Sequence, residues 1–200
     1  FMGIPGAMLL SEYSLVRYNL GYALYNTKDY TNALNHFKAF DSGINTTRLD
    51  ILADAKNRIA DCYYITTNYR LAIDYYDKVI EYGKIDADYA MYQKGFALGL
   101  INDQKGKASV LTTLVTKYPS SSFVPGAVFE RGRANILMKE IKKGETDFNL
   151  VINTFPKSPY VPRSIVQLGL SYFDTGDNPR AVAQFKKVIE NYQSTPEARY

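Results

Sequence analysis

Few side chains in this sequence are able to carry out chemistry. Its 200 residues include one histidine, His36, and one cysteine, Cys62. One residue of each type excludes a Cys/His metal cluster and leaves few pairings of a nucleophile with a base. We therefore expect His36 to have a surface or flanking role. We expect Cys62 to be a buried spacer, because buried thiols are usually inert.

Carboxylates are the remaining candidates for chemistry. Asp54 and Asp61 lie two turns apart on one face of an expected helix, a spacing that suits paired acids or a cation site. A solvated helix face is the simpler interpretation, and we adopt it. The glycines recur singly, so no glycine-rich phosphate loop is expected. The sequence thus predicts that the protein is not an enzyme and has no metal site and no cofactor.

The composition of the chain argues against two kinds of partner. The 24 basic and 20 acidic residues are scattered along the chain, without the basic stripe that nucleic-acid binding requires. The longest apolar run, "GIPGAMLL", is far shorter than the roughly 20 residues that span a bilayer. We therefore expect neither a nucleic-acid partner nor direct membrane insertion. The 18 Tyr and 10 Phe, with no Trp, indicate that aromatic side chains have a special use here.

The elements that must position these side chains are repeated. The phrase "YPSSSFVPGAVFERGRA" (118–134) returns 37 residues later as "FPKSPYVPRSIVQLGLS" (155–171). Extended upstream, the period aligns three columns. A column of small residues holds Gly21, Ala60, Gly95, Gly132 and Gly169. Two apolar columns follow it, made of Phe37, Tyr76, Leu111, Phe148 and Phe185, and of Phe40, Val79, Leu114, Val151 and Val188. Periods of 20 to 50 residues indicate a stacked repeat architecture.

Each repeat is predicted to form a helical hairpin. In segments such as "LAIDYYDKVI" and "AVAQFKKVIE", apolar residues recur every three or four positions, which predicts helices with one buried face. "YPSSS" and "FPKSP" place Pro and Ser where one helix ends and the next begins. Glycine inside a helix costs about 1 kcal/mol relative to alanine, and that cost is tolerated where a neighbouring helix must approach closely.

These residues resemble the tetratricopeptide repeat family. The pattern of a small residue and an aromatic in the first helix, then an alanine and an aromatic in the second, is present in "LGYALYNTKDYTNALNHF", "IADCYYITTNYRLAIDYY" and "QLGLSYFDTGDNPRAVAQF". Ala33 and Ala72 occupy the small position of the second helix. Lys107 and Gly144 replace that alanine in the two middle units, and Asn135 replaces a first-helix aromatic. The packing of these two units is therefore in doubt.

The resemblance implies an all-α fold, an α-solenoid of about five helix-turn-helix hairpins forming a right-handed superhelix. We expect a single array over 1–200, with units at approximately 14–46, 53–84, 88–119, 125–156 and 162–193. The closing "STPEARY" looks like the opening of a sixth unit, so we expect a fragment of a longer repeat protein. The joint phrase is also similar to that of bacterial envelope repeat proteins. It favours a periplasmic or cell-envelope location, and a cytoplasmic one stays open.

The family uses the first helices to line a concave groove that grips peptides or proteins. Residues that flank the small column should face this groove, and we expect them to form an aromatic binding surface with a few charges. They are Tyr18, Tyr22, Tyr25, Asp61, Tyr64, Tyr89, Tyr92, Phe96, Phe129, Arg133 and Phe173. Packing between repeats is the alternative role for each of these aromatics.

The sequence therefore favours a non-catalytic scaffold that binds a protein or peptide partner. Two alternatives stay open. Aromatic platforms also stack on sugar rings, so the chain could be a glycan-binding module of the cell envelope. It could instead be a spacer or self-association segment of a longer array, because repeat arrays leave apolar faces at their ends.

Overall fold

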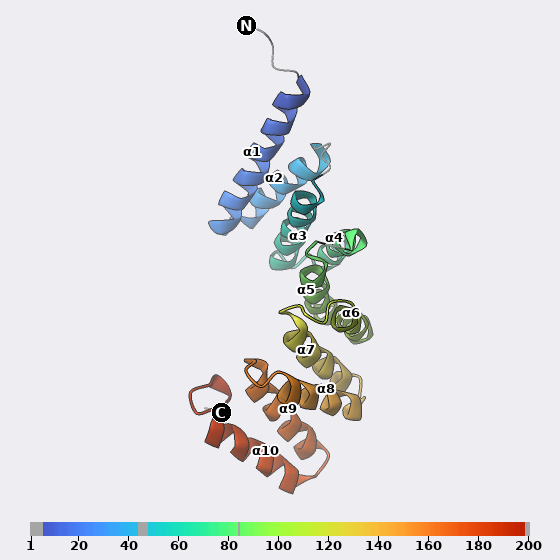
Figure 1. The fold of residues 1–200 in the computed structure, drawn as a ribbon, viewed down its shortest axis with the longest axis vertical. Coiled ribbons are helices and arrows are strands. Elements are labelled where there is room, and N and C mark those ends of the chain that lie inside the picture. Colours follow the sequence, from blue (N-terminus) through green and yellow to red (C-terminus); the bar gives the residue numbers. More distant parts are fainter. Residues whose placement is uncertain (1–5, 44–47, 84, 199–200) are drawn as a thin grey trace. The chain divides into compact units, whose positions relative to one another are not determined.

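The computed structural model describes residues 6–43, 48–83 and 85–198, and these residues are almost entirely helical (Figure 1). The helices in chain order are α1 (Gly6–Asn26), α2 (Tyr30–Gly43), α3 (Leu49–Ile65), α4 (Tyr69–Tyr82), α5 (Ala87–Leu100), α6 (Gln104–Lys117), α7 (Val124–Leu137), α8 (Ile141–Thr154), α9 (Tyr160–Asp174) and α10 (Asn178–Asn191), followed by the 3₁₀ helix η1 (Pro196–Ala198). The predicted all-α fold of repeated helical hairpins is confirmed. In the described ranges, no helix is both long enough and apolar enough to cross a membrane.

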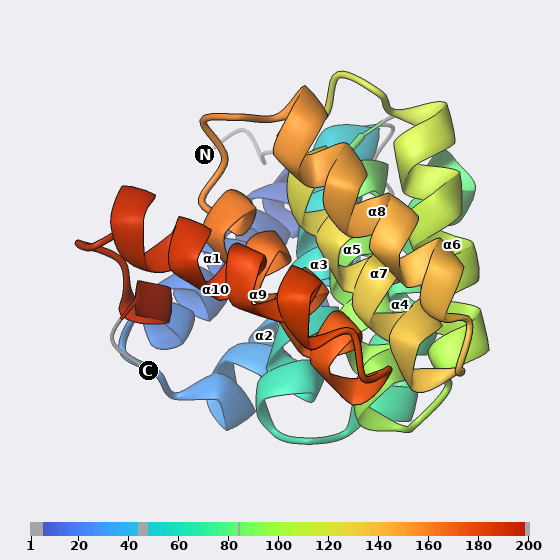
Figure 2. The ribbon, with the colours of Figure 1, turned by 90° about the horizontal axis from the view of Figure 1, so that it is seen from below.

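The chain forms two compact units, unit 1 (Phe1–Ile101) and unit 2 (Asn102–Tyr200), divided in the turn between α5 and α6. In unit 1, α1 packs on α2 and α3 on α4, and α5 packs against α4. In unit 2, α7 packs against α6 and α8, and α9 packs against α8 and α10, as Figure 2 also shows. The prediction of one continuous array stays a prediction.

The turns inside the hairpins follow the repeat. A residue with positive φ lies at the same repeat position in each of the five turns, namely Lys28, Thr67, Asn102, Lys139 and Gly176, with φ between 65° and 81°. Only the last is a glycine. The next residue directly precedes the second helix, and at two of these positions the carboxylates of Asp103 and Asp177 accept hydrogen bonds from backbone N–H groups three residues on. This left-handed residue followed by an N-cap reverses the chain within three residues.

The small-residue column has the role expected of it. A Cβ atom at Gly132 would lie 2.8 Å from a ring carbon of Phe148, and one at Gly169 would lie 2.6 Å from the ring of Phe185. The second-helix phenylalanine therefore fills the space that the glycine leaves. This contact sets the separation of the two helices in these hairpins.

Buried polar pairs occupy the positions where the middle units depart from the repeat pattern. Lys107 Nζ lies 2.5 Å from Glu130 Oε2, and both side chains are buried. Asn135 donates to Asp147 at 3.1 Å, and Arg131 donates to both oxygens of the same carboxylate. These two repeats thus have buried ion pairs and hydrogen bonds where other repeats have small and aromatic side chains.

Candidate binding site

One face of α3, which is the first helix of its hairpin, carries three charged residues. Asp54, Arg58 and Asp61 follow one another at spacings of four and three residues, so they share one face of the helix. Arg58 Nη1 lies 2.8 Å from Asp61 Oδ2, and Arg58 Nε lies 3.7 Å from Asp54 Oδ1. Asp61 is only 5% exposed, so the solvated-face interpretation is wrong for this residue. The physical reason is that side chains from α4 and α5 cover it.

Two phenols from α1 bind the Asp54 end of this row. Tyr18 donates a hydrogen bond to Asp54 Oδ2 at 2.6 Å, and Tyr22 donates to the same oxygen. Their rings make a T-shaped contact with centroids 5.1 Å apart. Because the donors and the acceptor belong to neighbouring hairpins, these bonds fix α1 against α3.

Two further phenols bind the Asp61 end. Tyr76 of α4 donates to Asp61 Oδ1 at 2.7 Å, and Tyr89 of α5 lies 2.9 Å from both carboxylate oxygens. Gln93 in turn donates to the Tyr89 hydroxyl at 3.2 Å. The Asp61 carboxylate therefore joins three helices.

Arg58 lies between aromatic rings as well as between carboxylates. Its Cζ atom is 5.7 Å from the ring centroid of Tyr25 and 5.4 Å from that of Tyr89, which is cation–π range. Its buried Nε has no hydrogen-bond partner among the described residues. We name the set Tyr18, Tyr22, Tyr25, Asp54, Arg58, Asp61, Tyr76 and Tyr89 the tyrosine network.

Burial sets the protonation of this network. It raises the pKa of Tyr18 to about 12, and the Asp54 carboxylate adds to the effect. Burial also raises the pKa values of Tyr22, Tyr76 and Tyr89. The pKa of Asp61 is raised by burial, while Arg58 and the two phenols oppose that rise. The phenols thus stay protonated donors near neutral pH, which suits binding better than proton transfer.

Five of the predicted groove residues meet in the tyrosine network: Tyr18, Tyr22, Tyr25, Asp61 and Tyr89. The other three in unit 1 pair elsewhere. Tyr64 makes a T-shaped contact with Tyr69, and Tyr92 stacks edge-on with Phe96 at 5.0 Å within α5.

The three predicted groove residues of unit 2 do not form a comparable cluster. Phe129 is only 5% exposed and packs against both Phe148 and Tyr160, so its ring lies in the core. Arg133 is exposed and pairs with Glu130 at 3.1 Å. Phe173 is 60% exposed near the end of α9.

Sequence reasoning missed Arg58 and Tyr76 as members of the site. The signal for Arg58 was present, because a basic residue four positions after one aspartate and three before another can pair with both. Tyr76 was assigned only to an apolar column. Its ring is buried there as expected, and its hydroxyl reaches Asp61.

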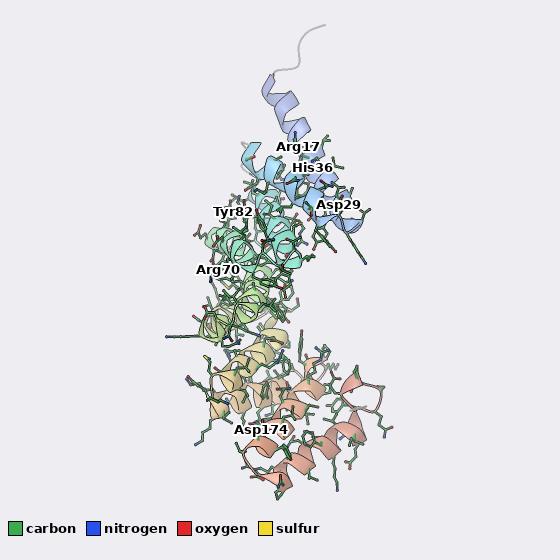
Figure 3. All side chains as sticks on the ribbon, turned by 180° about the vertical axis from the view of Figure 1, so that it is seen from behind. Arg17, Asp29, His36, Arg70, Tyr82 and Asp174 are labelled. Atoms are coloured by element: carbon green, nitrogen blue, oxygen red, sulfur yellow. The ribbon has the colours of Figure 1, made fainter. Side chains whose placement is uncertain are left out.

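The two lone reactive residues lie outside this network. Cys62 is fully buried, as expected, and burial raises the pKa of its thiol to about 12. His36 is half-buried on α2 and is labelled in Figure 3. Over the described ranges, His, Cys, Asp and Glu side chains do not gather in a group that could hold a metal ion.

Unit 2 contains a polar cavity of about 810 Å³ between α6, α7 and α8. Arg131, Asn135 and Asp147 line it, and the Asp147 carboxylate accepts hydrogen bonds from both of the other side chains. Threonine hydroxyls such as that of Thr112 donate to their own helix. The polar groups of this cavity are therefore largely occupied within the unit.

Comparison with known families identifies the repeat. Three segments, 53–82, 89–121 and 163–195, match models described as tetratricopeptide repeat. These three segments are thus similar to tetratricopeptide repeats. A search of curated protein sequences gave no match.

Solved tetratricopeptide-like structures share the fold. MamA (residues 41 to the end) from Desulfovibrio magneticus RS-1 is 20% identical, with a TM-score of 0.76 over 92% of this chain and 97% of that one. YrrB, described as a TPR protein with an unusual peptide-binding site, is 16% identical, with a TM-score of 0.70 over 92% and 88%. The apo form of RapI is 11% identical, with a TM-score of 0.83 over 92% and 55%. At these identities the likeness concerns the fold alone.

Proposed function

We propose that this protein is a non-catalytic scaffold that binds a peptide segment of a partner protein on the face of unit 1 that carries the tyrosine network. The observation that carries the proposal is Arg58, whose Cζ atom lies 5.7 Å from the ring centroid of Tyr25 and 5.4 Å from that of Tyr89 and whose side chain is still 20% exposed. Tetratricopeptide repeats are generally scaffolds for protein–protein contacts. YrrB, which shares the fold and has a peptide-binding site, is in keeping with this use of it.

The chemistry of the network favours a particular kind of peptide. Half-buried tyrosines such as Tyr18 and Tyr25 offer rigid aromatic area with a polar tip, which is typical of binding hot spots. The tyrosine network contains two aspartates and one arginine, so acidic side chains outnumber basic ones in it. Burial raises the pKa of nearby Asp86, the charges of Asp54 and Asp88 raise it further, and the charge of Arg58 lowers it. A segment with a Lys or Arg side chain beside an apolar one therefore fits this face best.

Selection of displayed random peptides on the immobilised chain tests the proposal. We expect enrichment of peptides with basic side chains. Binding of an enriched peptide should fall at least tenfold in Arg58→Lys, because lysine loses the planar guanidinium that lies between the rings. Arg70→Lys is the matched control, since Arg70 is exposed on α4 and is labelled in Figure 3.

Circular dichroism of both variants would confirm that the helices are retained. Enriched peptides that bind Arg58→Lys as tightly as the native chain would place the binding surface elsewhere. Failure to enrich any peptide would remove the proposal. A periplasmic or envelope location stays a prediction, which fractionation of the source cells would test.

A further inference from the structure

A second cavity of unit 2, of about 460 Å³, lies between two connections that join one hairpin to the next. Ser122 and Pro125, around the start of α7, form one wall. The segment 155–160 between α8 and α9 forms the other. Both walls are built from residues well inside the chain. The volume lies within the range of about 300–1,000 Å³ that is usual for small-molecule sites.

Most residues that line this cavity carry a ring. They are Pro125, Phe155, Pro156, Pro159 and Tyr160. Each proline fixes its own backbone φ, so the walls have little freedom to move. The Tyr160 ring is held in place by Phe129, since the two ring centroids are 5.4 Å apart and Phe129 is buried. A flat ring of a ligand can therefore stack on walls that are already formed.

Hydrogen bonds also fix the 155–160 segment. The Ser158 N–H donates to the Phe155 carbonyl oxygen at 2.9 Å, and the Tyr160 N–H donates to Ser158 Oγ at 3.2 Å. The Ser158 hydroxyl is thus an acceptor within the segment. In the described part of the chain it donates to no other group, so its proton is left for a ligand.

The charge of the cavity comes from Lys157. This side chain is exposed and has no ion pair among the residues that the structure describes. Of those residues, none with an acidic side chain lines the cavity. Arg163 lies near the Tyr160 ring, at 5.8 Å, but it pairs with Glu197. An ammonium group and a hydroxyl donor beside apolar rings complement an anion.

We propose that this cavity binds a small aromatic carboxylic acid. The ring of the acid stacks on the ring-lined walls, and its carboxylate accepts hydrogen bonds from Lys157 and the Ser158 hydroxyl. An ionised carboxylate is only an acceptor, which suits two donors. The site goes beyond the peptide-binding face proposed above, because that face belongs to unit 1 and this cavity to unit 2. Either proposal can fail without the other.

Titration of the whole chain with 2-naphthylacetate, followed by NMR of the backbone amides, tests the site. The uncharged 2-naphthylacetamide is the matched ligand. We expect the acid to shift amide signals in the segments 121–124 and 157–161. An acid of about 14 non-hydrogen atoms should bind with a Kd of about 1 mM or lower. The amide should bind at least about threefold more weakly, because it has no charge to pair with Lys157.

Three variants with exposed positions locate the two parts of the site. Lys157→Gln should bind the acid and the amide equally, because the cation that distinguishes them is gone. Pro159→Ser introduces the residue that the preceding connection has at this position, Ser122, and should weaken both ligands. Lys142→Gln is the matched control, since Lys142 is exposed at the opposite end of α8, and it should bind like the native chain.

Two results on the native chain alone would overturn the proposal. One is the absence of shifts at about 10 mM acid, and the other is a set of shifts confined to other segments. Equal binding of the acid and the amide, or an equal loss in Lys142→Gln and Lys157→Gln, would contradict the role of Lys157. An acetylated tripeptide ending in phenylalanine that binds ten times more tightly than the acid would assign the cavity to peptide ends instead.

Discussion

Tyr18 and Tyr22 donate to one oxygen of Asp54, while Tyr76 and Tyr89 donate to Asp61. Each carboxylate therefore receives two phenol hydrogen bonds in addition to its interaction with Arg58. Hydrogen bonds to charged acceptors are the stronger kind, and a buried carboxylate that loses its donors is costly. At the scale of residues, the network thus stabilises the stacking of α1, α3 and α5, and it is the surface that we propose for a partner.

Tyr22→Phe should lower the free energy of unfolding by about 1–3 kcal/mol, because the ring stays while the hydrogen bond to Asp54 is lost. The effect should depend on pH. The pKa of Tyr22 is raised in the folded chain, so its contribution is complete below the ordinary value of 10.0 and declines as pH rises above it. Urea unfolding at about pH 8 and about pH 11 measures this, and the native chain should lose more stability than the variant.

Tyr30→Phe is the control for this change, because no hydrogen bond of the Tyr30 hydroxyl is found among the described residues. It should change stability by less than about 0.5 kcal/mol. Equal losses in Tyr22→Phe and Tyr30→Phe would mean that the bond to Asp54 contributes nothing.

Lys107→Ala restores the residue that the repeat family has at this position, yet it should destabilise the chain by roughly 2–4 kcal/mol. The reason is that Glu130 would be left buried with only Arg133 beside it. Chemical denaturation measures the loss. Adding Glu130→Gln to Lys107→Ala should recover part of it, and a double variant that is worse than the single one would contradict this explanation.

The hairpins are held at short range by glycine against aromatic ring and are closed by a left-handed residue before the second helix. Gly144 of unit 2 is a second kind of close contact within a hairpin. A Cβ atom there would lie 2.6 Å from Cδ1 of Ile136 and 2.9 Å from the carbonyl oxygen of Gly132. The backbones of α7 and α8 therefore approach more closely than an alanine allows. At the scale of elements, the departure from the repeat pattern is a packing requirement.

Gly144→Ala should consequently destabilise the chain by about 1–3 kcal/mol, even though alanine favours a helix by about 1 kcal/mol. Thermal unfolding followed by circular dichroism measures this. Gly43→Ala is the control, since a Cβ atom at Gly43 meets nothing within 4 Å. A Gly144→Ala chain at least as stable as the native one would show that α7 and α8 can separate freely.

Two compact units, unit 1 (Phe1–Ile101) and unit 2 (Asn102–Tyr200), describe the molecule at its largest scale. The ion pairs of Arg58 with Asp54 and Asp61 belong to unit 1. The buried pairs of Lys107 with Glu130 and of Arg131 with Asp147 belong to unit 2. The two units are therefore stabilised by different sets of polar contacts.

The repeats, their helices and the close contact at the glycine column could be predicted from the sequence, because each depends on the spacing of residues within about 40 positions. The class of function followed from the same pattern and from the scarcity of reactive groups. The packing role of Gly132 and the burial of Cys62 needed only this local reasoning.

Tertiary structure alone decided which groove residues form a site. Tyr18 reaches Asp54 across 36 residues and Tyr89 reaches Asp61 across 28, so no local spacing could pair them. Phe129 entered the core because Phe148 and Tyr160, from two other helices, close over its ring. The physical reason is that hydrogen bonds and ring contacts depend on three-dimensional proximity, which stacking creates, whereas helix formation depends on neighbours along the chain.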